Sequence, residues 1–329
     1  QGIVSMPDSP VRQLEILDSA ELDTLLVDWN RTATDYPAAA SIQACFEKQV
    51  VDTPAATAIS CDGESLSYAE LNRRANQMAH YLLSHGVEHE TLIALSLERS
   101  IEAVITVLGI LKAGAAYAPL DPAYPEPRLR YMLEDMASPL LITHSDINPE
   151  LATGDCKRVN IDTIATELAT LPDRNPVNRS AGSSLAYAIY TSGSTGLPKG
   201  TLIEHRSVLR LVINSHFAPL RQCLRIGMLA PISFDASTLE IWGSLLNGGE
   251  CVVFSDRIPS IDKLRKFFAD ETIDLLWLTS TLFNSIIDTE PDILRSVRII
   301  MTGGEALSTA HIARAADLLP ATRLINGYG

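Results

Sequence analysis

The sequence predicts an α/β protein built on mostly parallel sheets whose faces are covered by helices. Three observations lead to this fold class. Short apolar runs such as PLLITH, residues 139–144, lack a polar face and are typical of strands buried on both sides. Stretches with helical spacing alternate with these runs, which is the order found when helices connect parallel strands. A chain of 329 residues is also long enough for about two structural units.

Four stretches have the apolar spacing of amphipathic helices. The first is short and lies near the N-terminus, with Ser19 as its predicted cap. Two longer helices are predicted over residues 67–86 and 100–114, and each ends on a glycine that accepts a left-handed C-terminal turn. The fourth covers residues 125–136 and carries proline in its first turn.

The apolar runs between and after these helices are predicted as strands. They are TLIALSL (91–97), AYAPL (116–120), PLLITH (139–144), LAYAIY (185–190), RIGMLAP (225–231), ECVVF (250–254), DLLWL (274–278), RIIMT (298–302) and RLIN (323–326). In open parallel sheets a ligand binds beyond the carboxyl ends of the strands. The residues that follow these runs are therefore the first candidates for a site.

Composition and charge exclude several classes of protein. The chain has 46% hydrophobic and 20% charged residues, which is ordinary for a globular protein. Its 26 basic and 40 acidic residues give a net charge of −14, so we expect no nucleic-acid partner. The five cysteines are scattered and form no C-x-x-C pair, which argues against a disulfide framework or a zinc site.

The same sequence shows no targeting signal that we recognise. No basic segment followed by an apolar one opens the chain, so a signal peptide is not predicted. The longest apolar stretch, residues 101–111, is too short to span a bilayer. We therefore expect a cytoplasmic protein without a membrane partner.

The most informative stretch is YTSGSTGLPKG, residues 190–200, directly after a predicted buried strand. Its glycines let backbone amides approach a phosphate, its hydroxyls donate hydrogen bonds, and Lys199 supplies positive charge. It is not a Walker A motif, because Pro198 replaces the expected glycine and Gly200 replaces the Ser or Thr after the lysine. The alternative is a flexible Ser/Gly surface loop without a ligand.

Six motifs in order resemble the adenylation domains of nonribosomal peptide synthetases, in the adenylate-forming superfamily. They are LSYAELN (66–72), LKAGAAYAPLDPAYPEPRLRYML (111–133), YTSGSTGLPKG (190–200), SFDAS (233–237), GGEAL (303–307) and NGYG (326–329). The resemblance implies that residues 31–329 form the N-terminal core of such a domain, with two doubly wound subdomains. It also implies that residues 1–30 are a linker from an upstream condensation domain.

The resemblance implies the following reaction. An amino acid reacts with ATP, accompanied by Mg²⁺, to give an aminoacyl-adenylate and pyrophosphate. The acyl group then moves to the phosphopantetheine thiol of a downstream peptidyl carrier domain. Donors and cations are needed where the leaving pyrophosphate gains charge. The residues expected to hold the phosphates, with Thr191 and Lys199 also catalytic, are Thr191, Ser192, Gly193, Ser194, Thr195, Gly196 and Lys199.

The adenine of ATP needs a stacking face and hydrogen bonds to its edge. The resemblance assigns these roles to Gly304, Glu305, Ala306, Asn326 and Tyr328. The alternatives are that Tyr328 is a core aromatic residue and that GGEAL is a plain turn between strand and helix.

Asp235 is the expected partner of the substrate's α-ammonium group. The alternative is that its carboxylate caps the helix that follows. The substrate pocket implied by the resemblance consists of Asp235, Ala236, Leu239, Trp277, Met301, Gly303 and Gly327. Apart from Asp235 this wall is apolar, which favours valine or a similar small aliphatic amino acid. Trp277 and Met301 are also expected to be strand core residues.

The sequence ends at Gly329, before the Pro-Thr-Glu that continues this motif in the family. The resemblance implies that the magnesium-binding Glu, the ribose-binding Asp, the barrel and the small C-terminal domain with its catalytic lysine lie beyond this point. We therefore expect the fragment to be nearly inactive alone. Three alternatives stay open: an acyl- or aryl-CoA ligase, a degenerate scaffold domain and an unrelated phosphate-binding regulatory domain.

Overall fold

The computed structural model describes residue 10 and residues 16–151, 153–192, 197–222 and 225–327. Residue contacts divide the chain into two units, Gln1–Asp35 and Tyr36–Gly329. The first contains helix α2, Ser19–Asp23, which continues into a π-helical turn, Thr24–Asp28. Ser19 is not its cap as predicted. Asp18 is the cap, because its carboxylate accepts from the Glu21 N–H at 2.8 Å and its own N–H donates to the Glu21 carboxylate at 3.0 Å.

The described part of the second unit contains a seven-stranded sheet in the order β13-β12-β11-β9-β10-β1-β2. Its strands are β1 Thr57–Cys61, β2 Glu64–Ser67, β9 Arg225–Met228, β10 Glu250–Val253, β11 Leu275–Thr279, β12 Ile299–Gly303 and β13 Arg323–Gly327. All neighbours pair in parallel except β1 and β2, which form an antiparallel hairpin at one edge. The parallel strands therefore end at the same side of the sheet.

A six-stranded sheet in the order β6-β5-β3-β4-β7-β8 completes the strand structure of the described residues. Its strands are β3 Leu92–Ser96, β4 Ala116–Pro119, β5 Leu140–Thr143, β6 Lys157–Asn160, β7 Leu185–Ser192 and β8 Pro198–Glu204. Again one antiparallel pair, β7 and β8, lies at an edge. This sheet also turns the carboxyl ends of its parallel strands to one side.

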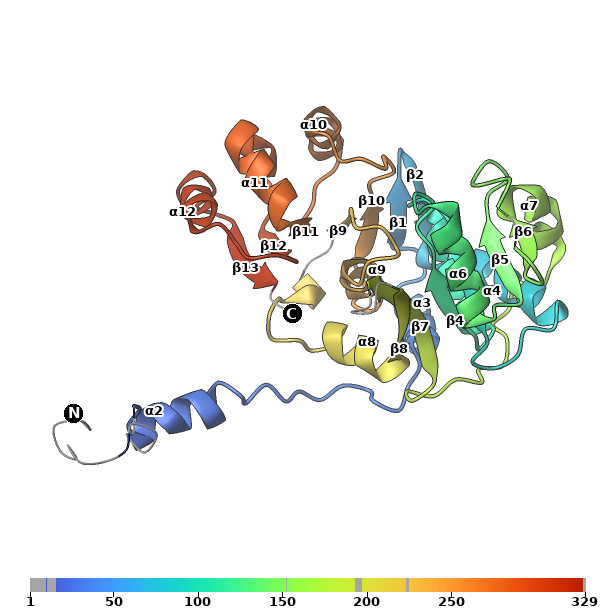
Figure 1. Cartoon of the computed structure of the whole chain (residues 1–329), viewed down its shortest axis with the longest axis horizontal. Helices are drawn as coiled ribbons and strands as arrows, with labels where there is room; N and C mark the ends of the chain where they lie inside the picture. The colour runs from blue at the N-terminus through green and yellow to red at the C-terminus, as the bar shows by residue number, and fades with distance from the viewer. Residues whose placement is uncertain (1–9, 11–15, 152, 193–196, 223–224, 328–329) are drawn as a thin grey trace. The chain divides into compact units, whose positions relative to one another are not determined.

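Helices cover both sheets (Figure 1). They are α3 Ile42–Asp52, α4 Tyr68–Ser84, α5 Ile101–Lys112, α6 Glu126–Met136, α7 Ile161–Thr170, α8 His205–Val212, α9 Ala236–Leu245, α10 Ile261–Asp270, α11 Ser280–Thr289 and α12 Thr309–Leu318, with short 3₁₀ turns at Leu220–Gln222 and Pro291–Leu294. The helices predicted over residues 67–86 and 100–114 are confirmed, and the backbones of Gly86 and Gly114 have φ of +78° and +84°.

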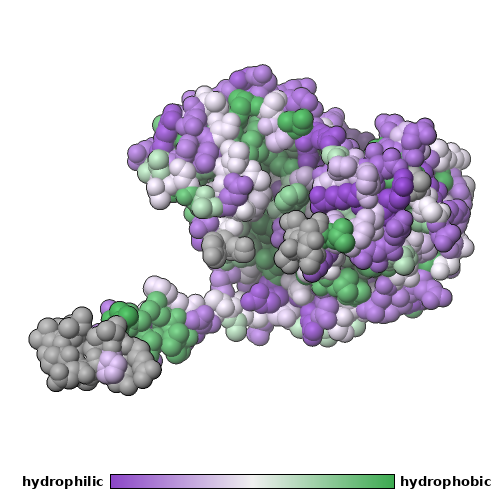
Figure 2. All heavy atoms as spheres, viewed as in Figure 1, coloured by the Kyte–Doolittle hydropathy of each residue, from purple (hydrophilic) through white to green (hydrophobic). Residues whose placement is uncertain are grey.

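Three hydrophobic clusters show how the layers pack. The largest joins the facing sides of the two sheets through α3, α4, α5, α8 and α9. A second lies between the seven-stranded sheet and α10–α12, and a third lies between the six-stranded sheet and α6. On the face that Figure 2 shows, polar side chains predominate on this unit, and apolar ones gather between the part that carries α10–α12 and the part that carries the six-stranded sheet. The predicted helix-covered, mostly parallel sheets are confirmed.

Four strands were missed: β1, β2, β6 and β8. Residues 198–204 pair with β7 as strand β8, although residues 198–200 were predicted to belong to a loop. The reason is that β8 lies at a sheet edge and is largely exposed, so it has no continuous apolar run to reveal it. No helix in the described parts of the chain is long and apolar enough to cross a membrane.

Candidate active site

The carboxyl edge of the seven-stranded sheet brings together most of the residues predicted to bind substrate. The register places Trp277 of β11 beside Met301 of β12. It also places Gly303 of β12 beside Gly327 of β13, with Asn326 one residue earlier beside Thr302. Five predicted residues from three strands therefore converge on one edge, because parallel strands end together.

Asp235 reaches this region from the neighbouring strand, in the loop between β9 and α9. It occupies the N-cap position of α9, but its side chain makes no capping hydrogen bond. The side chain is exposed. The structure therefore does not support the capping alternative, and the carboxylate is accessible to a ligand.

The charge of Asp235 also acts on the six-stranded sheet. Burial raises the pKa of Tyr187 on β7, and the Asp235 carboxylate adds to this rise. The Thr238 hydroxyl on α9 donates to the Tyr187 hydroxyl at 3.1 Å. Asp235 therefore lies where the two sheets approach each other, near the strand that leads into the predicted phosphate loop.

The remaining side chains of the predicted pocket are apolar and mostly buried. Leu239 and Met301 are buried, with 5% and 8% of their surfaces exposed, and Ala236 is 9% exposed. Trp277 is partly buried and packs against the same hydrophobic cluster as Leu239 and Met301. The expectation that Trp277 and Met301 also belong to the strand core is therefore confirmed.

The packing around Gly303 and Gly327 explains why these positions are occupied by glycine. A Cβ atom at Gly303 would lie 2.1 Å from the carbonyl oxygen of Gly327, so a side chain cannot be placed there without moving β13. At Gly327 a Cβ would lie 3.4 Å from the indole nitrogen of Trp277. Gly303 is therefore required by the neighbouring strand, in addition to its predicted place in the pocket.

The turn predicted to cover adenine follows β12. Gly304 has a φ of +83°, which favours glycine, and Gly304, Glu305 and Ala306 are exposed. The Ser280 hydroxyl of α11 donates to the carbonyl oxygens of Gly303 and Glu305, each at 3.1 Å. Sequence analysis did not identify Ser280, whose only signal is a hydroxyl at the start of a helix after a strand. Asn326 is exposed, and Tyr328 lies outside the described residues.

The predicted phosphate loop connects β7 to β8. Thr191 and Lys199 lie opposite each other in this hairpin, and both are exposed. The Tyr190 hydroxyl donates to the Asp135 carboxylate at 2.7 Å, and a Cβ at Gly200 would lie 3.2 Å from the Tyr190 ring. These contacts fix the base of the hairpin. Gly193, Ser194, Thr195, Gly196 and the Ser192 side chain lie outside the described residues.

Two cavities open at the carboxyl edges. One of about 290 Å³ is lined by Trp277 and by residues that sequence analysis missed, among them Phe234, Thr279 and Leu282. The exposed aromatic ring of Phe234, 54% accessible and adjacent to Asp235, is the signal that points to a ligand-facing position.

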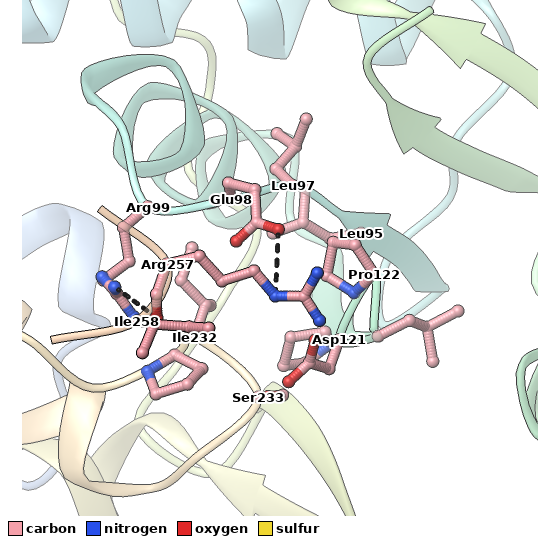
Figure 3. A pocket seen from close by; sticks show the side chains of 13 residues that line it. Leu95, Leu97, Glu98, Arg99, Asp121, Pro122, Ile232, Ser233, Arg257 and Ile258 are labelled. Carbon is pink, nitrogen blue, oxygen red and sulfur yellow. Dashed lines mark hydrogen bonds and ion pairs between the residues drawn. The ribbon is translucent and has the colours of Figure 1, made fainter. Parts of the chain in front are cut away.

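The second cavity, of about 370 Å³, lies between the ends of β3 and β4 and the loops after β9 and β10. Figure 3 shows the Arg257 guanidinium lying between the carboxylates of Glu98 and Asp121, and its ion pair with Glu98 measures 3.9 Å. The Asp121 carboxylate also accepts from the Ala123 N–H at 2.8 Å. Both sheets therefore contribute their carboxyl edges to one open region.

No group of three or more His, Cys, Asp or Glu side chains in the described residues could hold a metal ion. What the described edge offers is an accessible carboxylate beside an apolar wall, a glycine-containing turn, and a hairpin that presents a hydroxyl and an ammonium group. This set matches an amine, an apolar group and a phosphorylated ligand.

The chain belongs to the AMP-binding enzyme family, which it matches over residues 46–329. The predicted resemblance to peptide synthetases is confirmed. The chain is 40% identical over 329 residues to a linear gramicidin synthase of Brevibacillus parabrevis, and 39% identical over 329 residues to gramicidin S synthase 2 of Brevibacillus brevis. All of the chain aligns, but it spans only 6% and 7% of these relatives.

Solved structures show the same relationship. The chain is similar to holo-PA1221, described as an NRPS protein containing adenylation and PCP domains, with a TM-score of 0.80 and 31% identity. This match covers 90% of the chain and 50% of PA1221. The N-terminal subdomain of NpsA from Klebsiella oxytoca has a TM-score of 0.80 at 23% identity over 91% of the chain and 74% of that protein, which shows the fold alone.

Proposed function

We propose that the chain is the core of an adenylation domain that activates an amino acid with ATP. A carboxylate oxygen of the amino acid attacks the α-phosphorus of ATP. The bond from that phosphorus to the bridging oxygen breaks, and pyrophosphate leaves with the electron pair. The observation that carries the proposal is Asp235, an accessible and uncapped carboxylate beside an apolar wall at the carboxyl edge of the sheet.

Asp235 binds the α-ammonium group of the substrate. A charge-assisted hydrogen bond of this kind is about twice as strong as a neutral one. An acid without the amine forfeits it, so the site prefers amino acids over fatty or aryl acids. This preference separates the proposed activity from that of an acyl- or aryl-CoA ligase.

ATP binds across the two edges in this proposal. The hydroxyl of Thr191 and the ammonium group of Lys199 donate to the phosphates, together with the predicted loop donors Ser192, Gly193, Ser194, Thr195 and Gly196. The turn at Gly304, Glu305 and Ala306 covers the adenine, with Asn326 and Tyr328 at its edge and face. Support comes from the exposure of Thr191, Lys199, Asn326 and the turn. Mg²⁺, when bound with ATP, neutralises phosphate charge.

The substrate side chain faces Ala236, Leu239, Trp277, Met301, Gly303 and Gly327. This wall offers no charged group, and the indole of Trp277 limits its depth, so we propose L-valine or a similar small aliphatic amino acid. A single methylene in such a pocket is worth only about 1–3 kcal/mol. Isoleucine and leucine are therefore expected to react more slowly rather than to be excluded.

The acyl group is proposed to pass to the phosphopantetheine thiol of a downstream peptidyl carrier domain, with residues 1–30 joining an upstream condensation domain. Support comes from the relatives, which are much longer synthases, and from PA1221, which is described as containing a PCP domain.

The test is amino-acid-dependent ATP–pyrophosphate exchange by the full-length protein, over a panel of amino, fatty and aryl acids. We expect a signal dominated by valine, and in Asp235→Ala a greatly weakened signal that remains only at high amino acid concentration. Asp262→Ala is the matched control, because Asp262 is an exposed carboxylate on α10 that pairs with Arg265. Exchange driven by fatty or aryl acids would assign the protein to the ligases instead. No exchange with any acid, from folded protein, would favour a scaffold.

A further inference from the structure

A fully buried carboxyl group, that of Glu240, lies on the helix that follows Asp235. Glu240 is on α9, five residues after Asp235, and none of its surface is exposed. Its Oε1 accepts from the backbone N–H groups of Leu229 and Ala230, both at 3.2 Å, and its Oε2 accepts from Ala230 at 3.1 Å. These two amides begin the loop that leaves β9 and ends at Asp235.

The other end of this loop is held by the same helix. The Ser237 hydroxyl donates to the carbonyl oxygens of Phe234 and Ile232, at 2.6 and 3.3 Å. The backbone N–H of Thr238 donates to the carbonyl oxygen of Asp235 at 2.9 Å. Because the Asp235 carboxylate makes no capping bond of its own, its position depends on the backbone of this doubly anchored loop.

Burying a carboxyl group here is costly, so its hydrogen bonds must offset that cost. Burial raises the pKa of Glu240 to about 8, while the two amides and the nearby charge of Arg99 lower it. Arg99 is itself held by the carbonyl oxygens of Phe254, at 2.8 Å, and Asp256. A leucine at position 240 would fill similar space but would leave two buried N–H groups unpaired.

We propose that Glu240 is a positioning residue for amino acid recognition, which holds the start of the loop so that Asp235 meets the substrate's ammonium group. This inference rests on the proposed function. It separates two roles along one helix: Asp235 contacts the substrate, and Glu240 acts only through the loop. Replacing Glu240 should therefore weaken binding of the amino acid without affecting binding of ATP.

The test compares Glu240→Leu and Glu240→Gln in the full-length protein by ATP–pyrophosphate exchange. We expect Glu240→Leu to raise KM for the amino acid about tenfold or more and to leave KM for ATP within about twofold. Glu240→Gln keeps one acceptor oxygen, so its KM for the amino acid should stay close to that of the wild type. The matched control is Ser244→Ala, because Ser244 is also fully buried on α9 but its hydroxyl donates to the carbonyls of Glu240 and Ile241 in its own helix and does not contact the loop amides.

A double variant distinguishes positioning from general damage. In an Asp235→Ala background, Glu240→Leu should raise KM for the amino acid no further. Hydrogen–deuterium exchange should show faster exchange at the Leu229 and Ala230 amides in Glu240→Leu, and no change there in Ser244→Ala.

Each outcome supports one inference or overturns it. If the wild-type protein is active and Glu240→Leu has the same KM for the amino acid, the positioning role alone is overturned. Equal increases in the KM values for ATP and the amino acid, repeated in the Asp235→Ala background, would also overturn it. Wild-type protein without amino-acid-dependent exchange would overturn the proposed function, and with it the positioning role.

Discussion

A buried histidine at the end of the β7–β8 hairpin makes the stability of the second unit sensitive to acid. His205 begins α8 directly after β8, and its side chain is fully buried. Its Nδ1 accepts from the backbone N–H of Ile42 at 3.2 Å, which requires the neutral ring. Burial, with a smaller contribution from His89, lowers the pKa of His205 from 6.5 to about 4.

The sign of the effect follows from proton binding. Between pH 6.5 and about 4 the unfolded chain binds a proton at His205 that the folded chain does not, so stability falls as the pH falls through this window. One pKa unit corresponds to about 1.4 kcal/mol. Lowering the pH from 7 to 4 should therefore remove about 3 kcal/mol of unfolding free energy through this one side chain.

The assay is urea unfolding of the chain at pH 7 and pH 4, for wild type and His205→Asn. The asparagine amide oxygen can still accept from Ile42, but it does not titrate. Carboxylates contribute to acid sensitivity in both proteins, so the difference between them isolates His205. We expect the variant to lose about 3 kcal/mol less than wild type over this interval. Equal losses in the two proteins would refute the reasoning.

Three further substitutions test the site region. Tyr190→Phe removes the hydrogen bond to Asp135 and should lower the unfolding free energy by about 1 kcal/mol in urea titrations; an unchanged midpoint would contradict this. Gly303→Ala forces a methyl group against the Gly327 carbonyl and should cost about 1–3 kcal/mol, measured in the same way. If Gly303 serves only to leave room for substrate, stability will not change. Trp277→Ala should shift relative kcat/KM toward larger amino acids by about tenfold or more, and an unchanged order of substrates would count against the proposed pocket.

Much of the fold was predictable because its signals are local. Strands buried on both faces appear as short apolar runs, and a glycine after an amphipathic stretch marks the end of a helix, as at Gly86 and Gly114. The residues proposed for the site, Asp235 and the predicted phosphate loop among them, were chosen from residue types and neighbours within about ten positions and stay predictions. Strands β2, β6 and β8 were not predictable, because exposed edge strands have little apolar patterning.

The site's geometry was not predictable from local patterns. Met301 meets Trp277, and Gly303 meets Gly327, only through the register of β11, β12 and β13. The sequence left helix capping open for Asp235, and the structure shows that its side chain makes no capping hydrogen bond.

Local residue patterns thus determine which elements form and which chemical groups this protein carries, because helix periodicity, strand burial and turn chemistry act over a few residues. Tertiary structure alone decides which of those groups meet. In the sequence, nothing distinguishes Glu240 from any other polar residue of a helix, yet folding buries it against the amides of Leu229 and Ala230. The packing of α9 against the end of β9 decides which partners meet, because a polar group that is buried there can no longer bond to water.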